Sequence, residues 1–123
     1  MSDYSLPYGE RLRSFGAIRR LFADGSGGFV YPFRYIVYAE PERELSVRVL
    51  FSVPKRNHKR ANVRNLLRRR TKEAYRLNKN LLHAGGKCGS VELALVYSSK
   101  DVVDYKTIEH AVKRILAAVG ENL

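Results

Sequence analysis

Residues 51–76 read FSVPKRNHKRANVRNLLRRRTKEAYR, and within this stretch a strand pattern gives way to a helical one. The first residues continue an alternation of apolar and polar side chains that is typical of a half-buried strand, and Pro54 ends it. From about residue 62 to 79 the apolar residues recur at helical spacing. The stretch therefore predicts a strand over 45–53 that leads through a basic loop at 55–60 into a long helix.

The positive charge of the chain is concentrated in the same stretch. The 123 residues include 23 Lys and Arg against 12 Asp and Glu, a net charge of +11. Ten of the basic residues and a single acid lie between Lys55 and Arg76, whereas the other 101 residues carry 13 basic and 11 acidic side chains. Such an excess indicates a polyanionic partner, either nucleic acid or an anionic membrane surface. One segment therefore carries the electrostatic part of the function.

The basic side chains of the predicted helix share one side. At about 100° per residue from Val63, Leu67 and Ala74 fall within about 40° and form the core side. Polar residues occupy an arc from about 100° to 240°, which only Tyr75 interrupts. Arg70 falls near 340°, beside the apolar stripe, where its long side chain must extend past apolar neighbours to bring its charge to water. Solvated faces usually mix charge signs, and Arg can clamp a phosphate with two hydrogen bonds, so the arc predicts a nucleic-acid-binding surface. Its members are Arg64, Asn65, Arg68, Arg69, Lys72 and Arg76.

The rest of the chain predicts one α+β domain over 1–123, with 1–10 loosely ordered. The order is α-β-β-(β)-α-β-α, and the short turn at 40–43 predicts that the strand at 45–53 runs antiparallel to the one before it. Before the basic segment, the sequence predicts a helix at 15–24, a flexible glycine loop at 25–28 and a strand at 29–39, from which 29–33 can split off. After it, the sequence predicts a loop at 83–90 and a strand at 91–97. The last predicted element is a C-terminal helix that is capped by Asp104 and stopped by Gly120.

Composition excludes several classes of protein. The single cysteine, Cys88, cannot form an intramolecular disulfide, and with three scattered histidines it provides no zinc framework. The longest apolar runs fall far short of the ~18 to 20 residues that cross a bilayer, and the N-terminus lacks the pattern of a signal peptide. These features predict a cytoplasmic protein.

Catalytic groups do not converge in the sequence. The acids are dispersed except for those at 40–44, which are typical of a solvated turn, and the histidines fall in different predicted elements. We expect His58 to be an exposed loop histidine. No catalytic residue and no metal site of the protein are therefore predicted, and the isolated chain is expected to be inert.

Residues 51–56 and 61–76 resemble the protein subunit of bacterial ribonuclease P, and the Arg-Asn pair at 64–65 with its downstream basic residues is the specific part of the match. Weaker similarity covers residues 11–13, 18–25, 35–38 and 91–97. The resemblance implies an α-β sandwich in which helices pack on a central mixed sheet. It also implies that the basic helix forms a left-handed crossover between parallel strands, against the usual right-handed rule.

The resemblance also implies a function. In that family the RNA subunit hydrolyses precursor tRNA and removes its 5′ leader, using Mg2+ held mainly by the RNA and the substrate. The protein binds the catalytic RNA through the motif helix and the single-stranded leader in a cleft between the sheet and the first helix. The implied partners are therefore the catalytic RNA and precursor tRNA, with no membrane and no obligate protein partner.

Individual residues match positions of the family. Those that match RNA-contacting positions are Arg64, Asn65, Arg68, Arg69 and Lys72, with Lys55 and Arg56 on the connection before them, and those that match the leader cleft are Ile18, Phe22, Tyr38 and Ser52. The basic residues Lys59, Arg60 and Arg76 complete the predicted RNA-binding segment. Aromatic faces suit stacked single-stranded bases, although Ile18 and Phe22 also fit a core stripe. The chain departs from the family pattern in a 55–61 connection one residue longer, in Leu66 where Arg is common, and in Arg70 where an aliphatic residue is common.

Three other functions compete with this hypothesis. A structural ribosomal protein could share the size, charge and fold type. A helix-turn-helix DNA-binding protein is disfavoured, because long strands flank the basic helix and no short helix precedes it. A membrane-surface helix is disfavoured, because its apolar side is needed for the core.

Overall fold

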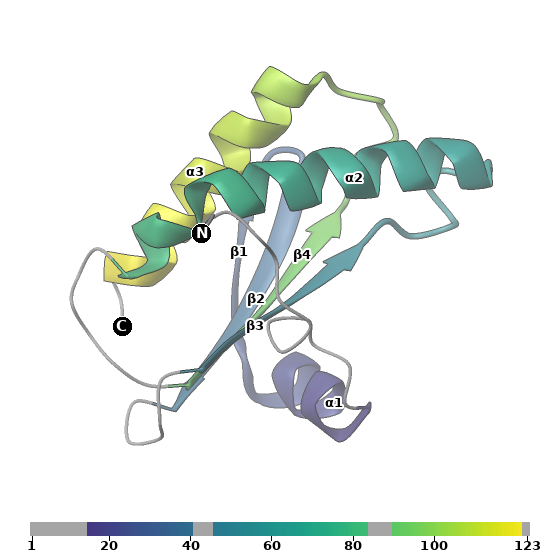
Figure 1. The fold of residues 1–123 in the computed structure, drawn as a ribbon. Helices are drawn as coiled ribbons and strands as arrows, with labels where there is room; N and C mark the ends of the chain where they lie inside the picture. Colours follow the sequence, from purple (N-terminus) through teal and green to yellow (C-terminus); the bar gives the residue numbers. More distant parts are fainter. Residues whose placement is uncertain (1–14, 41–45, 84–89, 122–123) are drawn as a thin grey trace.

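The computed structural model describes residues 15–40, 46–83 and 90–121 (Figure 1). The expectations for 1–10, for 41–45 and for Cys88 concern residues outside these ranges. The elements are α1 (Phe15–Asp24), β1 (Ser26–Val30), β2 (Phe33–Glu40), β3 (Ser46–Ser52), α2 (Ala61–Asn78), the 3-10 helix η2 (Lys79–His83), β4 (Ser90–Tyr97) and α3 (Tyr105–Glu121). The predicted helices and strands lie within a few residues of these bounds.

The four strands form one mixed sheet in the order β1-β2-β4-β3. β2 pairs with β4 antiparallel, and β3 pairs with β4 parallel, so β3 does run opposite to β2 as predicted. The two strands are not neighbours, however, because β4 lies between them. Residues 91–95 of β4 are buried on both faces, and such a strand takes a central position in a sheet. The α+β fold and the crossover between parallel strands through α2 are confirmed, while the handedness of that crossover stays a prediction.

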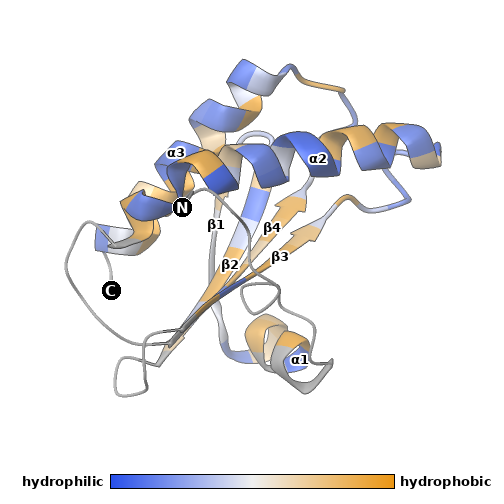
Figure 2. Cartoon of the chain, in the orientation of Figure 1, coloured by the Kyte–Doolittle hydropathy of each residue, from blue (hydrophilic) through white to orange (hydrophobic). Residues whose placement is uncertain are grey.

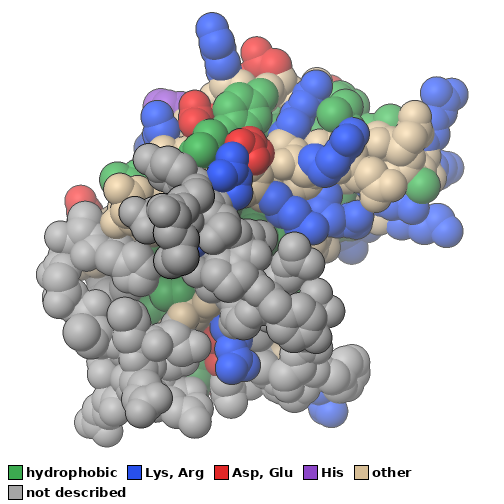
Figure 3. All heavy atoms as spheres, in the orientation of Figure 1, with side chains coloured by type: hydrophobic (Ala, Val, Ile, Leu, Met, Phe, Trp, Pro, Cys, Tyr) green, Lys and Arg blue, Asp and Glu red, His purple; other side chains and the backbone are tan. Residues whose placement is uncertain are grey.

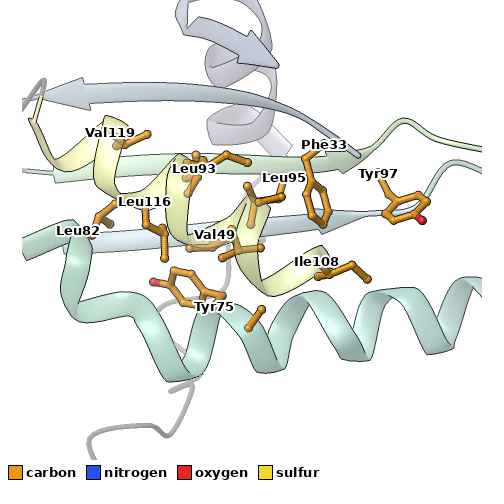
Figure 4. Close-up of a cluster of buried hydrophobic side chains, with 14 of the residues drawn as sticks. Phe33, Val49, Tyr75, Leu82, Leu93, Leu95, Tyr97, Ile108, Leu116 and Val119 are labelled. Atoms are coloured by element: carbon orange, nitrogen blue, oxygen red, sulfur yellow. The ribbon is translucent and has the colours of Figure 1, made fainter. Parts of the chain in front are cut away.

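Helices cover both faces of the sheet, with α2 and α3 on one face and α1 on the other (Figure 1). The strands β3 and β4 are coloured mostly as hydrophobic, and each helix carries both hydrophobic and hydrophilic residues (Figure 2). The main core joins strand residues such as Phe33 and Leu93 to Leu116 of α3 and Tyr75 of α2 (Figure 4). A smaller cluster around Leu21 fills the α1 face. Both faces are therefore packed, and α2 has a rigid base.

Tyr75 is buried, although the helical pattern places it within the polar arc of α2. The ring is 1% exposed and packs edge-on against Phe51, with ring centroids 5.7 Å apart. Leu67, Thr71 and Ala74 are also buried, which confirms the predicted core side. The polar arc is therefore narrower than the helical pattern alone indicates.

The glycine segment predicted as a flexible loop is the start of β1, and this prediction is wrong. Gly27 pairs with Ile36, and Gly28 pairs with Tyr35. A Cβ at Gly28 would lie 2.5 Å from the hydroxyl oxygen of Tyr35, so the aromatic side chain needs a glycine beneath it. Strand pairing outweighs the conformational freedom of these glycines, and the split between β1 and β2 is confirmed.

The C-terminal helix has its predicted cap but not its predicted stop. The backbone N–H of Thr107 donates to Oδ1 of Asp104 at 3.0 Å, and the hydrogen bonds from Thr107 lower the pKa of Asp104. Gly120 lies inside α3, which continues to Glu121. A Cβ at Gly120 would lie 2.8 Å from the carbonyl oxygen of Leu81, so this glycine allows α3 to approach η2 closely.

Candidate nucleic-acid interface

Lys and Arg side chains gather along α2 on the face seen in Figure 3. A concavity of ≈ 480 Å³ lies on this helix and is lined by Asn62, Asn65, Arg68, Arg69 and Lys72. These residues share a face because they are three or four positions apart. The structure thus brings together four of the predicted RNA-binding residues. It adds Asn62, which the spacing of three residues before Asn65 could have indicated.

The side chains that line this concavity are amides and cations. Nη1 of Arg68 donates to Oδ1 of Asn65 at 3.0 Å, which orients the amide and leaves the guanidinium charge in place. Arg69 is exposed, and its guanidinium donates no hydrogen bond to the described residues. The concavity can therefore accept an anion such as a backbone phosphate.

Arg64 has a structural task at the start of α2. Its Nη1 donates to the carbonyl oxygens of His58 and Lys59, at 2.9 Å and 2.8 Å. The side chain therefore folds back onto the basic loop and holds it against the helix. The remaining guanidinium donors stay available for a ligand.

His58 is buried and anchors the basic loop, so the expectation of an exposed histidine is wrong. It is 7% exposed, and its Nε2 lies 2.8 Å from the carbonyl oxygen of Ser99. Because a carbonyl oxygen only accepts, Nε2 carries the proton and donates. The ring also packs edge-on against Tyr97, with centroids 5.5 Å apart. The exposed cations of this loop are Lys55, Arg56, Lys59 and Arg60.

Arg70 turns away from the concavity and supports the fold. Its Nη1 donates to the carbonyl oxygen of Val103 at 2.8 Å, in the segment that precedes α3. This contact explains why a basic residue can stand beside the apolar stripe of α2. Leu66, the other exchange against the family pattern, is half-buried.

Arg76 lies at the far end of the basic face and is paired with the one acid of the segment. Its Nε donates to Oε2 of Glu73 at 3.1 Å, and its Nη2 donates to Oε1 of the same carboxylate. The hydrogen bond from Arg76 lowers the pKa of Glu73. The pair therefore stays ionised at neutral pH, and it is lost only as the pH falls below the usual titration range of glutamate.

The four predicted cleft residues lie on the α1 face of the sheet or on α1 itself. Ile18 and Tyr38 pack against the cluster of Leu21, which supports the core alternative for Ile18. Phe22 is 48% exposed, and Ser52 is half-buried at the end of β3. This face therefore presents one exposed ring from α1 and a half-buried tyrosine from the sheet.

Comparison with known proteins agrees with this geometry. The family model for ribonuclease P matches residues 6–120. The chain belongs to this family. A ribonuclease P protein component of Porphyromonas gingivalis W83 is 31% identical, over 98% of this chain and 90% of the relative. That of Chlorobaculum tepidum is 37% identical, over 78% of this chain and 69% of the relative. Membership in the ribonuclease P protein family removes the ribosomal and helix-turn-helix alternatives.

Solved structures share the fold of this ribonuclease P protein family member. The Thermotoga maritima protein aligns with a TM-score of 0.71 at 22% identity, over 89% of this chain and 96% of that one. A Staphylococcus aureus protein aligns with a TM-score of 0.68 at 17% identity, over 89% of this chain and 94% of that one. The sandwich inferred from the resemblance is therefore confirmed as a fold.

The described part of this ribonuclease P chain shows neither a cluster of metal ligands nor a membrane-spanning helix. Residues 15–40, 46–83 and 90–121 contain no group of three or more His, Cys, Asp or Glu that could hold a metal ion. None of the helices they form has the length and apolar content needed to span a bilayer.

Proposed function

We propose that this chain is the RNA-binding subunit of ribonuclease P, which binds the catalytic RNA through α2 and the 5′ leader of precursor tRNA through the α1 face. The observation that carries the proposal is the cationic concavity of α2 in a chain that belongs to this family. The complex would remove the leader to form the mature 5′ end of the tRNA.

The α2 surface suits a folded RNA because its cations are held before binding. The buried side of α2 packs on the main core, and Arg64 ties the N-terminal end of the helix to the basic loop. Side chains on a rigid element lose less conformational entropy when they bind. Lysine and arginine that contact phosphates release counterions from the RNA, which makes the affinity depend on salt.

The α1 face suits a single strand because it offers aromatic rings on which bases can stack. Phe22 is exposed, and Tyr38 lies half-buried on the sheet below α1. Bases of a single strand stack on aromatic side chains with little sequence preference. The two ligands would thus use opposite faces of the sheet.

The chemistry of cleavage is assigned to the RNA. Mg2+ bound by the RNA and the substrate would supply the activated water and the stabilised leaving oxygen. The protein would bind and orient both RNAs, and its positive charge would reduce the Mg2+ concentration that their close approach requires.

Reconstitution tests this proposal. The chain is combined with a ribonuclease P RNA, and cleavage of precursor tRNA is followed at low Mg2+. We expect 5′ processing that the RNA alone does not perform at the same Mg2+ concentration, and no cleavage by the protein alone. Equal rates with and without the protein would contradict the proposal, as would robust Mg2+-dependent cleavage by the RNA-free protein.

Glu73→Gln is expected to raise the affinity for a ribonuclease P RNA by about threefold to tenfold. The substitution removes the negative charge beside Arg76, so phosphates are attracted more strongly to this end of the basic face. The slope of log affinity against log salt should steepen by about 0.7 to 0.9. Filter binding over a salt series measures both quantities. Glu121→Gln is the control, because it makes the same charge change at an exposed position at the end of α3. An equal gain from the control would show that only net charge matters.

A further inference from the structure

Rows of side chains cross the α1 face of the sheet, and they alternate with the rows that face α2 and α3. Arg34, Val96 and Ser52 form one of these rows, because β2 and β3 both pair with β4 at Val96. Phe29 of β1 continues it, since it pairs with Arg34. Residues directly opposite each other in paired strands point to the same face. These four residues are called the outer row below.

The position of the outer row on this face is consistent with its neighbours. Val30, which follows Phe29, and Phe33, which precedes Arg34, both join the main core on the opposite face. The next row on the α1 face contains Ile36 and Ala94, and these two pack under Leu21 of α1. The outer row therefore lies beside the part of the sheet that α1 covers, toward the ends of β3 and β4.

Phe29 is the most exposed large apolar side chain of the described residues, at 64%. It makes no ring contact with another described aromatic residue. A phenylalanine in that position contributes little to the core, and an edge strand such as β1 normally carries polar side chains to limit unwanted pairing. Its exposed ring is available to stack on a planar ligand.

Arg34, which pairs with Phe29, is also exposed, and its side chain forms neither a hydrogen bond nor an ion pair with the described residues. A guanidinium beside an aromatic ring suits a nucleotide, whose base can stack while its phosphate accepts hydrogen bonds from Arg. The outer row then leads across the sheet to Ser52 of the predicted cleft. The exposed cations Lys55 and Arg56 follow Ser52 by three and four residues.

We propose that the outer row extends the leader site to the β1 edge, with Phe29 stacking on a leader base and Arg34 binding the adjacent phosphate. The inference rests on the proposed function and adds two residues that neither the sequence motif nor the predicted cleft contains. A second copy of the chain is the competing occupant of an exposed edge strand. It is disfavoured, because two copies of a chain of net charge +11 repel each other.

The test uses the reconstituted complex and precursor tRNAs with a leader of about ten nucleotides or of one nucleotide. Phe29→Ala is expected to weaken binding of the long-leader substrate about fivefold or more, because one stacked base is lost. Phe29→Tyr keeps a ring and should retain the affinity. Arg34→Ala should reduce the salt slope for the same substrate by about 0.7, the value for one phosphate contact of a single strand. Arg114→Ala, at an exposed position of α3, is the charge-matched control.

The outcomes separate this inference from the proposed function. Weaker binding by Phe29→Ala and Arg34→Ala that disappears with the one-nucleotide leader supports the outer row. If Phe22→Ala weakens long-leader binding while both outer-row variants match the wild type, the extension is overturned and the leader proposal stands. Equal losses with both leaders, or a loss of affinity for the catalytic RNA itself, would overturn the assignment to the leader. Wild-type dimers in sedimentation that Phe29→Ala dissociates would instead identify a second copy as the occupant.

Discussion

Replacing Arg68, Arg69 and Lys72 together by alanine is expected to lower the affinity for a ribonuclease P RNA about a hundredfold near physiological salt. The three side chains line one concavity on α2, and each phosphate contact contributes about 0.7 to 0.9 to the slope of log affinity against log salt. The slope should therefore fall by about two to three. Filter binding across a salt series gives both numbers.

A matched triple substitution controls for the loss of charge. Lys106, Lys113 and Arg114 are exposed on α3, and replacing them by alanine removes the same charge from another surface. We expect this control to change the affinity severalfold at most, through the general field of the protein. If both triple variants lose affinity equally, the protein binds RNA by net charge and the α2 concavity has no special role. Urea unfolding of the α2 variant should match the wild type, because none of its three substitutions removes a fully buried side chain.

His58→Ala is expected to lower the free energy of unfolding by about 2 to 3 kcal/mol. The substitution leaves a cavity beside Tyr97 and removes the donor to the carbonyl oxygen of Ser99. His58→Phe keeps a ring against Tyr97 but lacks the N–H, so it should lose about half as much. Urea denaturation measures the unfolding free energy of each variant.

The same substitution should affect RNA binding through the basic loop. The carbonyl of His58 accepts a hydrogen bond from Arg64, so a loosened loop also releases the side chain at the start of α2. We expect the affinity for the RNA to fall about threefold to tenfold in conditions where the variant is folded, since the loop must be ordered on binding. His110→Ala, at an exposed position of α3, is the control and should leave stability and affinity unchanged. A His58→Ala protein with wild-type stability would refute the anchoring role of the histidine.

The segment between β4 and α3 connects the two parts of the candidate interface. The carbonyl oxygen of Ser99 accepts a hydrogen bond from His58 of the basic loop, and the carbonyl oxygen of Val103 accepts one from Arg70 of α2. Tyr97 links them, since its hydroxyl oxygen accepts from the backbone N–H of Val103 at 3.1 Å. These contacts hold loop and helix against the same short stretch of chain, so their cations keep a constant spacing.

Local patterns were sufficient for much of this protein. Hydrophobic periodicity located α2 and α3 and the long strands, and the charge distribution selected 55–76 as the binding segment. Four of the side chains predicted from helical spacing do line one concavity. These features follow from short-range geometry, because residues three or four apart share a helix face and alternate residues share a strand face.

Long-range contacts decided the rest. The central position of β4 depends on burial from both faces, which no turn sequence specifies. The glycines of β1 form a strand because β2 supplies hydrogen bonds and Tyr35 needs the space. In the sequence His58 looks like a surface residue and Arg70 falls beside the apolar stripe of α2 without a partner nearby. Each finds its partner only 41 or 33 positions away. The sequence therefore determined which residues carry charge and which elements form. Tertiary packing determined which cations face a ligand, because a hydrogen-bond acceptor that is distant in the chain can bind a side-chain donor only after the protein has folded.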